Sequence, residues 1–261
     1  MLSKLMALAA LPRVYEKLLS ILRSGLEPFV SLREHMLYIL APYAGVIPEI
    51  GGGLKSLLLE GRETAPSLRI FLLKTLTTAL DTDEAAQVLQ RFCDPTFERN
   101  ATVQREAYRA LSDLYALENG SENEFFVTRL TTQAEPDAMC QIFLISVIEG
   151  LSQSRPEAMQ AFRHVLSHSA LYEDDVVQHA FFSLLTLAAG TGPTADSALA
   201  LVRETLLDED LRSHLYQSRA IQYAELHIAR LEPLREVLSE VSQSDASRLG
   251  DFFRSLIEVR T

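Results

Sequence analysis

Residues 88–114 read VLQRFCDPTFERNATVQREAYRALSDL, and this stretch contains two helix patterns separated by a break at Asp94-Pro95. Apolar residues recur three and four positions apart on both sides of the break, which is the spacing of an amphipathic helix. A proline among polar residues is typical of a connection between helices. The stretch therefore predicts a helical hairpin, made of a shorter helix, a loop and a longer helix.

The pattern of the longer helix recurs along the chain. Each copy starts with an apolar residue, and the position after it is called the slot. Apolar residues come again four and eight positions after that first residue, and the position seven after it is Ile39, Thr75, Ala110, Ser146 or Leu184. The copies are about 36 residues apart, inside the range of helical-hairpin repeats. One such hairpin cannot bury its apolar face alone, whereas stacked neighbours share a continuous core. The copies begin at Leu32-Arg33, Leu68-Arg69, Val103-Gln104, Met139-Cys140 and Val177-Gln178.

Helix punctuation divides the chain into these repeats. Prolines fall between the helix patterns, and Gly51-Gly52-Gly53 predicts a flexible turn before a short helix over 54–59. Residues 210–230 predict one long helix. We expect a single all-α domain over 1–261, a right-handed α-solenoid of about five to six hairpins plus a C-terminal capping helix. The hairpins are expected over 12–42, 46–80, 84–117, 121–152, 156–190 and 194–230, and the cap over 232–260.

Residues 88–114 resemble the HEAT repeat. In that family a first helix ends at an Asp-Pro loop, and the second helix carries Val-Arg, then Ala, then Ala-Leu, then Leu. The sequence departs from this pattern in the long loop after Pro95 and in Gln104, which occupies the arginine slot. The likeness extends over residues 12–190. Resemblance to the HEAT and armadillo-like families implies a curved helical stack whose longer helices line the concave surface.

Composition and charge restrict the class of protein. The net charge is −11, with 35 acidic and 24 basic residues, which argues against coating nucleic acid. No stretch reaches the roughly 18 apolar residues of a membrane-spanning helix. Cys93 and Cys140 lie in apolar helical surroundings, where a reduced thiol behaves as a small hydrophobic group. We therefore expect a reducing, cytoplasmic setting and no membrane span.

Motifs that carry chemistry are weak. Gly51 to Ser56 lacks the glycine directly before lysine and the preceding strand of a phosphate-binding loop. His164 and His168 share a helix face ahead of Asp174, Asp175 and His179, but a zinc-protease motif needs glutamate right after the first histidine, where Val165 stands. Exposed helix histidines and an acidic helix start explain the cluster without a metal. We predict no catalytic residue, no metal site and no cofactor.

The longer helices provide the candidate binding residues. Positions one and five after the slot predict a ladder across neighbouring helices. Lys74, Arg105 and Arg109 form a positive patch in its middle, which could attract an acidic peptide, a phosphorylated segment or a nucleic-acid backbone. The alternative is that these cations are solvated and paired with Glu106 or Asp113. The ladder comprises Glu34, Tyr38, Ile70, Lys74, Arg105, Arg109, Gln141, Ile145, His179 and Ser183.

Arg33 and Arg69, in the slot itself, are expected to make structural ion pairs between neighbouring repeats. The leading hypothesis for function is a non-enzymatic scaffold, adaptor or regulatory subunit that binds a protein or peptide, which is acidic or phosphorylated if the patch takes part. One alternative is an enzyme on a HEAT-like scaffold, such as an alkylpurine DNA glycosylase or a chromophore lyase. Another is a subunit or fragment of a larger assembly.

Overall fold

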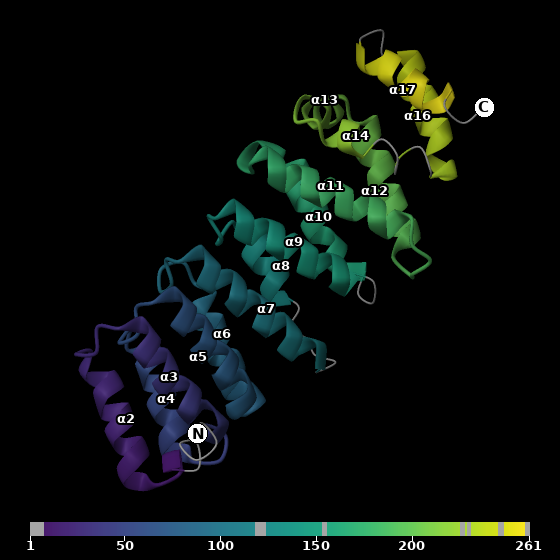
Figure 1. Ribbon diagram of the computed structural model, residues 1–261. Helices are drawn as coiled ribbons and strands as arrows, with labels where there is room; N and C mark the ends of the chain where they lie inside the picture. Colours follow the sequence, from purple (N-terminus) through teal and green to yellow (C-terminus); the bar gives the residue numbers. More distant parts are fainter. Residues whose placement is uncertain are drawn as a thin grey trace. The chain divides into compact units, whose positions relative to one another are not determined.

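The computed structural model describes residues 8–117, 124–152, 156–224, 228, 231–244 and 248–258 (Figure 1). Helices and short connections make up these ranges and no strand occurs in them, which confirms the all-α prediction. The helices pack mostly against their neighbours in sequence. The chain divides into two compact units, Met1–Asn119 and Gly120–Thr261.

The N-terminal unit consists of helices that follow one another as pairs. In each pair the leading helix packs against the second helix, and the second helices also pack on each other. The second helix is the longer one except in the first pair, where α3 has 11 residues and α2 has 13. Proline occupies the first turn of α2, α4 and α5, where its missing N–H would have no partner in any case. The helices are α2 (Pro12–Ser24), α3 (Val30–Leu40), α4 (Pro48–Leu59), α5 (Pro66–Ala79), α6 (Thr82–Phe92) and α7 (Ala101–Leu117), with a short 3-10 turn, η1 (Ala41–Tyr43).

The C-terminal unit continues the same kind of pairing. Helix α11 packs against both α9 and α12, and the last two helices pack tightly on each other. The helices are α8 (Glu124–Thr131), α9 (Ala138–Ser152), α10 (Met159–Ser167), α11 (Asp174–Ala188), α12 (Ala195–Leu207), α13 (Glu209–Gln217), α14 (Ala220–Tyr223), α16 (Arg235–Ser244) and α17 (Arg248–Glu258), with the 3-10 turns η3 (Pro156–Ala158), η4 (Ser169–Leu171) and η5 (Glu232–Leu234).

Each unit buries the apolar stripes of its helices. In the N-terminal unit the Tyr108 ring is fully buried and its hydroxyl donates to the Cys93 carbonyl oxygen at 3.0 Å. In the C-terminal unit Phe162 and Phe181 are fully buried. Cys93 and Cys140 are buried and belong to no disulfide, and their burial confirms the prediction from their apolar surroundings.

The glycine turn predicted at residues 51–53 is wrong, because these residues lie inside α4, which begins at Pro48. A Cβ on Gly51 would lie 2.5 Å from the Ala44 carbonyl oxygen, and one on Gly53 would lie 2.7 Å from the Leu19 side chain. The glycines therefore permit close packing within a helix rather than a turn, at a cost in helix propensity.

The long helix predicted over 210–230 is also interrupted. Helix α13 ends at Gln217, and Arg219 follows with φ 64°, in the left-handed region that terminates a helix. The short helix α14 then starts at Ala220. The cap region contains two described helices, α16 and α17, in place of one. Within the described ranges, every helix is too short or too polar to cross a membrane.

Candidate binding face

A glutamate in the loop before each of four longer helices forms the same local contact. Its carboxylate accepts the backbone N–H two residues later, at 3.0 Å from Phe29, 2.9 Å from Ala65, 2.8 Å from Asn100 and 3.1 Å from Asp137. Such a bond closes the loop and fixes where the helix starts. These four loop glutamates are Glu27, Glu63, Glu98 and Glu135, spaced 36, 35 and 37 residues apart.

Two of the loop glutamates also hold an arginine from the preceding hairpin. Arg33 of α3 donates from Nε and Nη2 to Glu63 at 2.9 and 3.0 Å, and Arg69 of α5 donates from Nη1 to Glu98 at 3.1 Å. Both carboxylates are buried, so each charge depends on its partner. The ion pairs between neighbouring repeats that the slot predicts are thus confirmed for Arg33 and Arg69.

These ion pairs tie the successive hairpins of the N-terminal unit together and place α3, α5 and α7 side by side (Figure 1). The outward side chains of the three helices form one surface, which we call the α3–α5–α7 face. It is defined by Glu34 and Tyr38 of α3, Phe71 and Lys74 of α5, and Arg105 and Arg109 of α7.

An aromatic pair occupies one part of the α3–α5–α7 face. The rings of Tyr38 and Phe71 stack with centroids 6.2 Å apart and an interplanar angle of 29°. Tyr38 remains 59% exposed in this pair. The ladder includes Tyr38 but misses Phe71, which lies one position beyond Ile70 and is half-buried. Exposed aromatic rings on a rigid helix are suited to packing against a partner.

Three cations lie beside the aromatic pair. Lys74 Nζ is 3.1 Å from Glu106 Oε1, and Arg109 pairs with the same carboxylate oxygen at 2.5 Å. Arg105 donates to the Ala101 carbonyl oxygen at 3.3 Å and makes no ion pair with any described residue. Glu106 therefore pairs with both Lys74 and Arg109, whereas Arg105 pairs with no carboxylate among the described residues. Pairing with Glu106 applies to Lys74 and Arg109, and the charge of Asp113 also acts on Arg109.

Glu106 is held as a carboxylate by this arrangement. Its partial burial alone would raise its pKa, but hydrogen bonds from Arg109 and Lys74 outweigh burial and lower the pKa below the ordinary value. The hydrogen bond to Glu106 likewise raises the pKa of Arg109. Lys74, Arg105 and Arg109 outnumber the two glutamates of this face, Glu34 and Glu106, although the protein as a whole carries a net charge of −11.

The ladder does not continue as an exposed surface on α9 and α11 of the C-terminal unit. Gln141 and Ile145 are buried, and Gln141 Nε2 donates to the Glu135 carbonyl oxygen at 2.7 Å. Ser183 is buried and donates to Glu149 Oε2 at 2.6 Å. Only His179, among the ladder residues proposed there, is exposed.

The reason on α9 is a register error of one residue. Loop glutamates lie five positions before the first apolar residue in Glu63–Leu68 and Glu98–Val103, and Glu135 lies five before Cys140. Gln141, not Cys140, therefore occupies the slot, and the outward positions become Ile142 and Ser146. The recurring glutamate was the signal in the sequence that could have fixed this register.

The histidine pair of α10 shares a face, as its spacing predicts. The rings of His164 and His168 stack with centroids 4.4 Å apart, and the Tyr172 ring meets His164 edge-on. Burial, and secondarily the charge of His168, lowers the pKa of His164. Among the described residues no group of three or more metal-binding side chains comes together.

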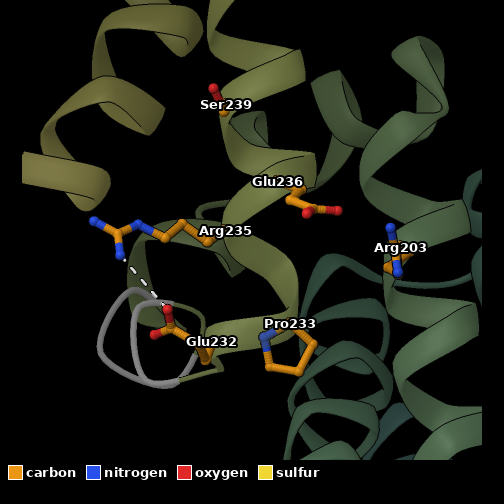
Figure 2. A pocket seen from close by; sticks show the side chains of 6 residues that line it. All are labelled: Arg203, Glu232, Pro233, Arg235, Glu236 and Ser239. Atoms are coloured by element: carbon orange, nitrogen blue, oxygen red, sulfur yellow. Dashed lines mark ion pairs between the residues drawn. The ribbon is translucent and has the colours of Figure 1, made fainter.

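Two open pockets lie elsewhere. One, of about 610 Å³, has Arg203 of α12 across from Glu236 of α16, with the Arg235–Glu232 ion pair at its rim (Figure 2). Among the lining residues that the structure describes, two arginines balance two glutamates, and none is a histidine or a cysteine. The other, of about 640 Å³, lies between α2 and α4 over the backbone of Gly52.

Searches of protein-family models, curated proteins and solved structures found no match to this chain. What the molecule does must therefore be argued from its own repeats and surfaces.

Proposed function

We propose that the protein is a non-enzymatic interaction module, a HEAT-like α-solenoid that binds a protein or peptide along the α3–α5–α7 face. The recurrence of the loop glutamates supports the solenoid, because the same contact returns at nearly constant spacing with an arginine or glutamine six residues later. Arg33 and Arg69 connect two of these loop glutamates to the preceding hairpin, and contacts between successive hairpins are what propagate a helical stack.

The observation that carries the binding proposal is the juxtaposition of an exposed aromatic pair with excess positive charge on one rigid surface. Tyr38 and Phe71 supply apolar area whose ordering costs little conformational entropy. Lys74, Arg105 and Arg109 supply charge that Glu106 only partly neutralises. The partner this surface fits is a peptide segment with acidic or phosphorylated side chains beside an apolar residue.

The test uses the full chain and fluorescein-labelled peptides of defined sequence, with fluorescence anisotropy as the readout. The probes are an array of ten-residue peptides in which one leucine or phenylalanine is flanked by glutamate, by phosphoserine or by glutamine. We expect saturable binding to the acidic or phosphorylated members and weak binding to the neutral ones. The triple variant K74E/R105E/R109E should weaken that binding by at least about tenfold.

A matched control changes the same charge elsewhere in the N-terminal unit. Arg13, Lys17 and Arg62 are exposed and lie outside the face, so the variant R13E/K17E/R62E should bind within about twofold of the parent chain. Equal losses of affinity in both triple variants would mean that the net charge of the protein, and not the α3–α5–α7 face, determines peptide binding. Tyr38→Ala should weaken binding without altering net charge, and unchanged affinity in that variant would remove the aromatic pair from the proposal.

The alternative of a larger assembly has one observation in its favour, a cluster of exposed apolar side chains in the loop before α3. Contiguous apolar surface of this kind often marks a protein contact. The enzyme alternatives, a DNA glycosylase or a chromophore lyase, stay predictions from the resemblance. Duplex-DNA binding at low salt with a steep salt dependence would favour the first of these.

A further inference from the structure

The loop glutamate of the first hairpin has only part of the contacts that its equivalents have. Glu27 accepts the Phe29 N–H at 3.0 Å, as Glu63 and Glu98 do for their own loops. Glu63 and Glu98 also bind an arginine of the preceding longer helix, whereas no arginine in the described ranges pairs with the Glu27 carboxylate. Arg33 donates to the Glu27 carbonyl oxygen at 2.8 Å, and its hydrogen bonds to a carboxylate go to Glu63. The hydrogen bond to Glu63 is the main cause that raises the pKa of Arg33, and the nearby charge of Glu27 adds to it.

The apolar side chains around Glu27 are also exposed, and Leu32 among them is far more exposed than its equivalents in later hairpins. Leu32 is 44% exposed, although its equivalents Leu68, Val103 and Cys140 are 2%, 0% and 0% exposed. Leu26 and Phe29 are 83% and 67% exposed, and Val30 is 43% exposed. We call this surface the Glu27 edge, defined by Leu26, Glu27, Phe29, Val30 and Leu32.

We propose that the Glu27 edge is a docking surface for an amphipathic helix of a partner protein that presents an arginine among apolar residues. The chain itself shows what covers this edge in later hairpins. Helix α3 packs on α5 and sends Arg33 to Glu63, and α5 packs on α7 and sends Arg69 to Glu98. The same combination, supplied by another protein, completes the first copy.

The two parts of the occupant have separate tasks. Burying Leu26, Phe29 and Leu32 removes apolar surface from water and provides most of the driving force. An arginine placed on the Glu27 carboxylate fixes the register of the incoming helix, because a guanidinium can donate to both carboxylate oxygens at once. This surface is distinct from the α3–α5–α7 face, so the inference goes beyond the proposed function and does not require it.

The probe is a synthetic peptide with the sequence of α5, residues 66–79, held helical by a side-chain staple and labelled with fluorescein. This helix already binds a loop glutamate inside the chain through Arg69. Anisotropy titration with the full chain should give saturable binding. Glu27→Arg in the protein, or Arg69→Glu in the peptide, should weaken binding at least about tenfold, and combining the two should restore it.

Three controls make the result specific. Glu60→Arg, an equal charge change at an exposed position away from the edge, should leave affinity within about twofold of the parent. Leu32→Asp should weaken binding independently of Glu27, and circular dichroism should show unchanged helicity in every variant. K74E/R105E/R109E should bind the α5 peptide as the parent does, which separates this proposal from the proposed function.

Absence of saturable binding, equal binding by the Glu27→Arg variant, or failure of the double exchange to restore affinity would overturn the proposal. Sedimentation velocity of the chain alone provides the remaining outcome. Self-association that Glu27→Arg abolishes would assign the edge to a second copy of this chain and so also overturn it.

Discussion

At the scale of single residues, the buried ion pair between Arg69 and Glu98 is the most demanding contact of the N-terminal unit. Glu98 is 1% exposed, and the Arg69 guanidinium also lies 5.4 Å from the centre of the Phe92 ring. Replacing Arg69 by methionine leaves a buried carboxylate without its cation, which we expect to cost about 3–5 kcal/mol of the free energy of unfolding. Urea denaturation followed by circular dichroism measures this loss.

An exposed pair provides the comparison. Arg62 and Glu60 are both more than half exposed and lie 3.4 Å apart, so Arg62→Met should cost only about 0–1 kcal/mol. A similar cost at Arg62 and Arg69 would show that burial does not decide the energy of these pairs. In that case the loop glutamates would not be the contacts that join the hairpins.

His164 makes stability depend on pH in a direction that follows from its surroundings. Burial first, and then the charge of His168, lowers its folded-state pKa below the ordinary value of 6.5. The unfolded chain therefore binds more protons than the folded one between these two values. This contribution is complete above pH 6.5 and is lost as the pH falls through the folded-state pKa.

We therefore expect the melting temperature to fall as the pH decreases below 6.5, and His164→Gln to reduce that slope. The His168→Gln variant removes the nearby charge and should reduce it less, because burial is the larger cause. Differential scanning calorimetry between pH 7.5 and about 5 compares the variants. If the dependence of melting temperature on pH is unchanged in His164→Gln, other titrating groups cause the loss of stability at low pH.

At the scale of elements, α4 offers a matched pair of glycine substitutions. A Cβ on Gly52 meets nothing within 4 Å, so Gly52→Ala should stabilise the helix by about 0.5–1 kcal/mol. A Cβ on Gly51 would lie 2.5 Å from the backbone oxygen of Ala44, so Gly51→Ala should destabilise the protein. Thermal denaturation should show that the melting temperatures of the two variants shift in opposite directions. Equal shifts would contradict the close packing of Gly51 against the Ala44 backbone.

The same helix shows what the sequence could and could not predict. Apolar spacing and proline positions predict the all-α class, and α12 (Ala195–Leu207) starts one residue inside the hairpin expected over 194–230. Three glycines in a row indicate a turn, because glycine has a low helix propensity. The close approach of Ala44 and Leu19, which requires glycine at positions 51 and 53, depends on tertiary packing and leaves no local pattern. Local patterns therefore predicted elements better than their contacts.

The candidate face shows the same limit. Its middle was predictable because Lys74, Arg105 and Arg109 hold outward positions in helices with a clear arginine slot. On α9 the apolar composition is almost uniform, so the outward positions were assigned one residue away from the true register, and Gln141 proved to be buried. Hydrophobic periodicity carries little information where every face of a helix is apolar.

At the scale of the whole molecule, the loop glutamates connect local chemistry to architecture. Glu27, Glu63 and Glu98 recur in the N-terminal unit, and Glu135 shows the same backbone contact in the C-terminal unit. A motif that returns in both units with a spacing near 36 residues is the expected consequence of one hairpin type reused along the chain. An α-solenoid is the arrangement in which such hairpins bury their apolar faces against each other.

This proposal makes a prediction about size in solution. A compact globular protein of 261 residues has a radius of gyration of about 18 Å. Six hairpins stacked at the usual helix separation of about 10 Å would extend about 60 Å along the stack, and the radius of gyration should then lie clearly above the compact value. Small-angle X-ray scattering over a concentration series measures it without interference from association. Only hairpins that stack in one direction lengthen the molecule. A radius of gyration near 18 Å with a symmetric distance distribution would therefore indicate a compact helical bundle and contradict the solenoid.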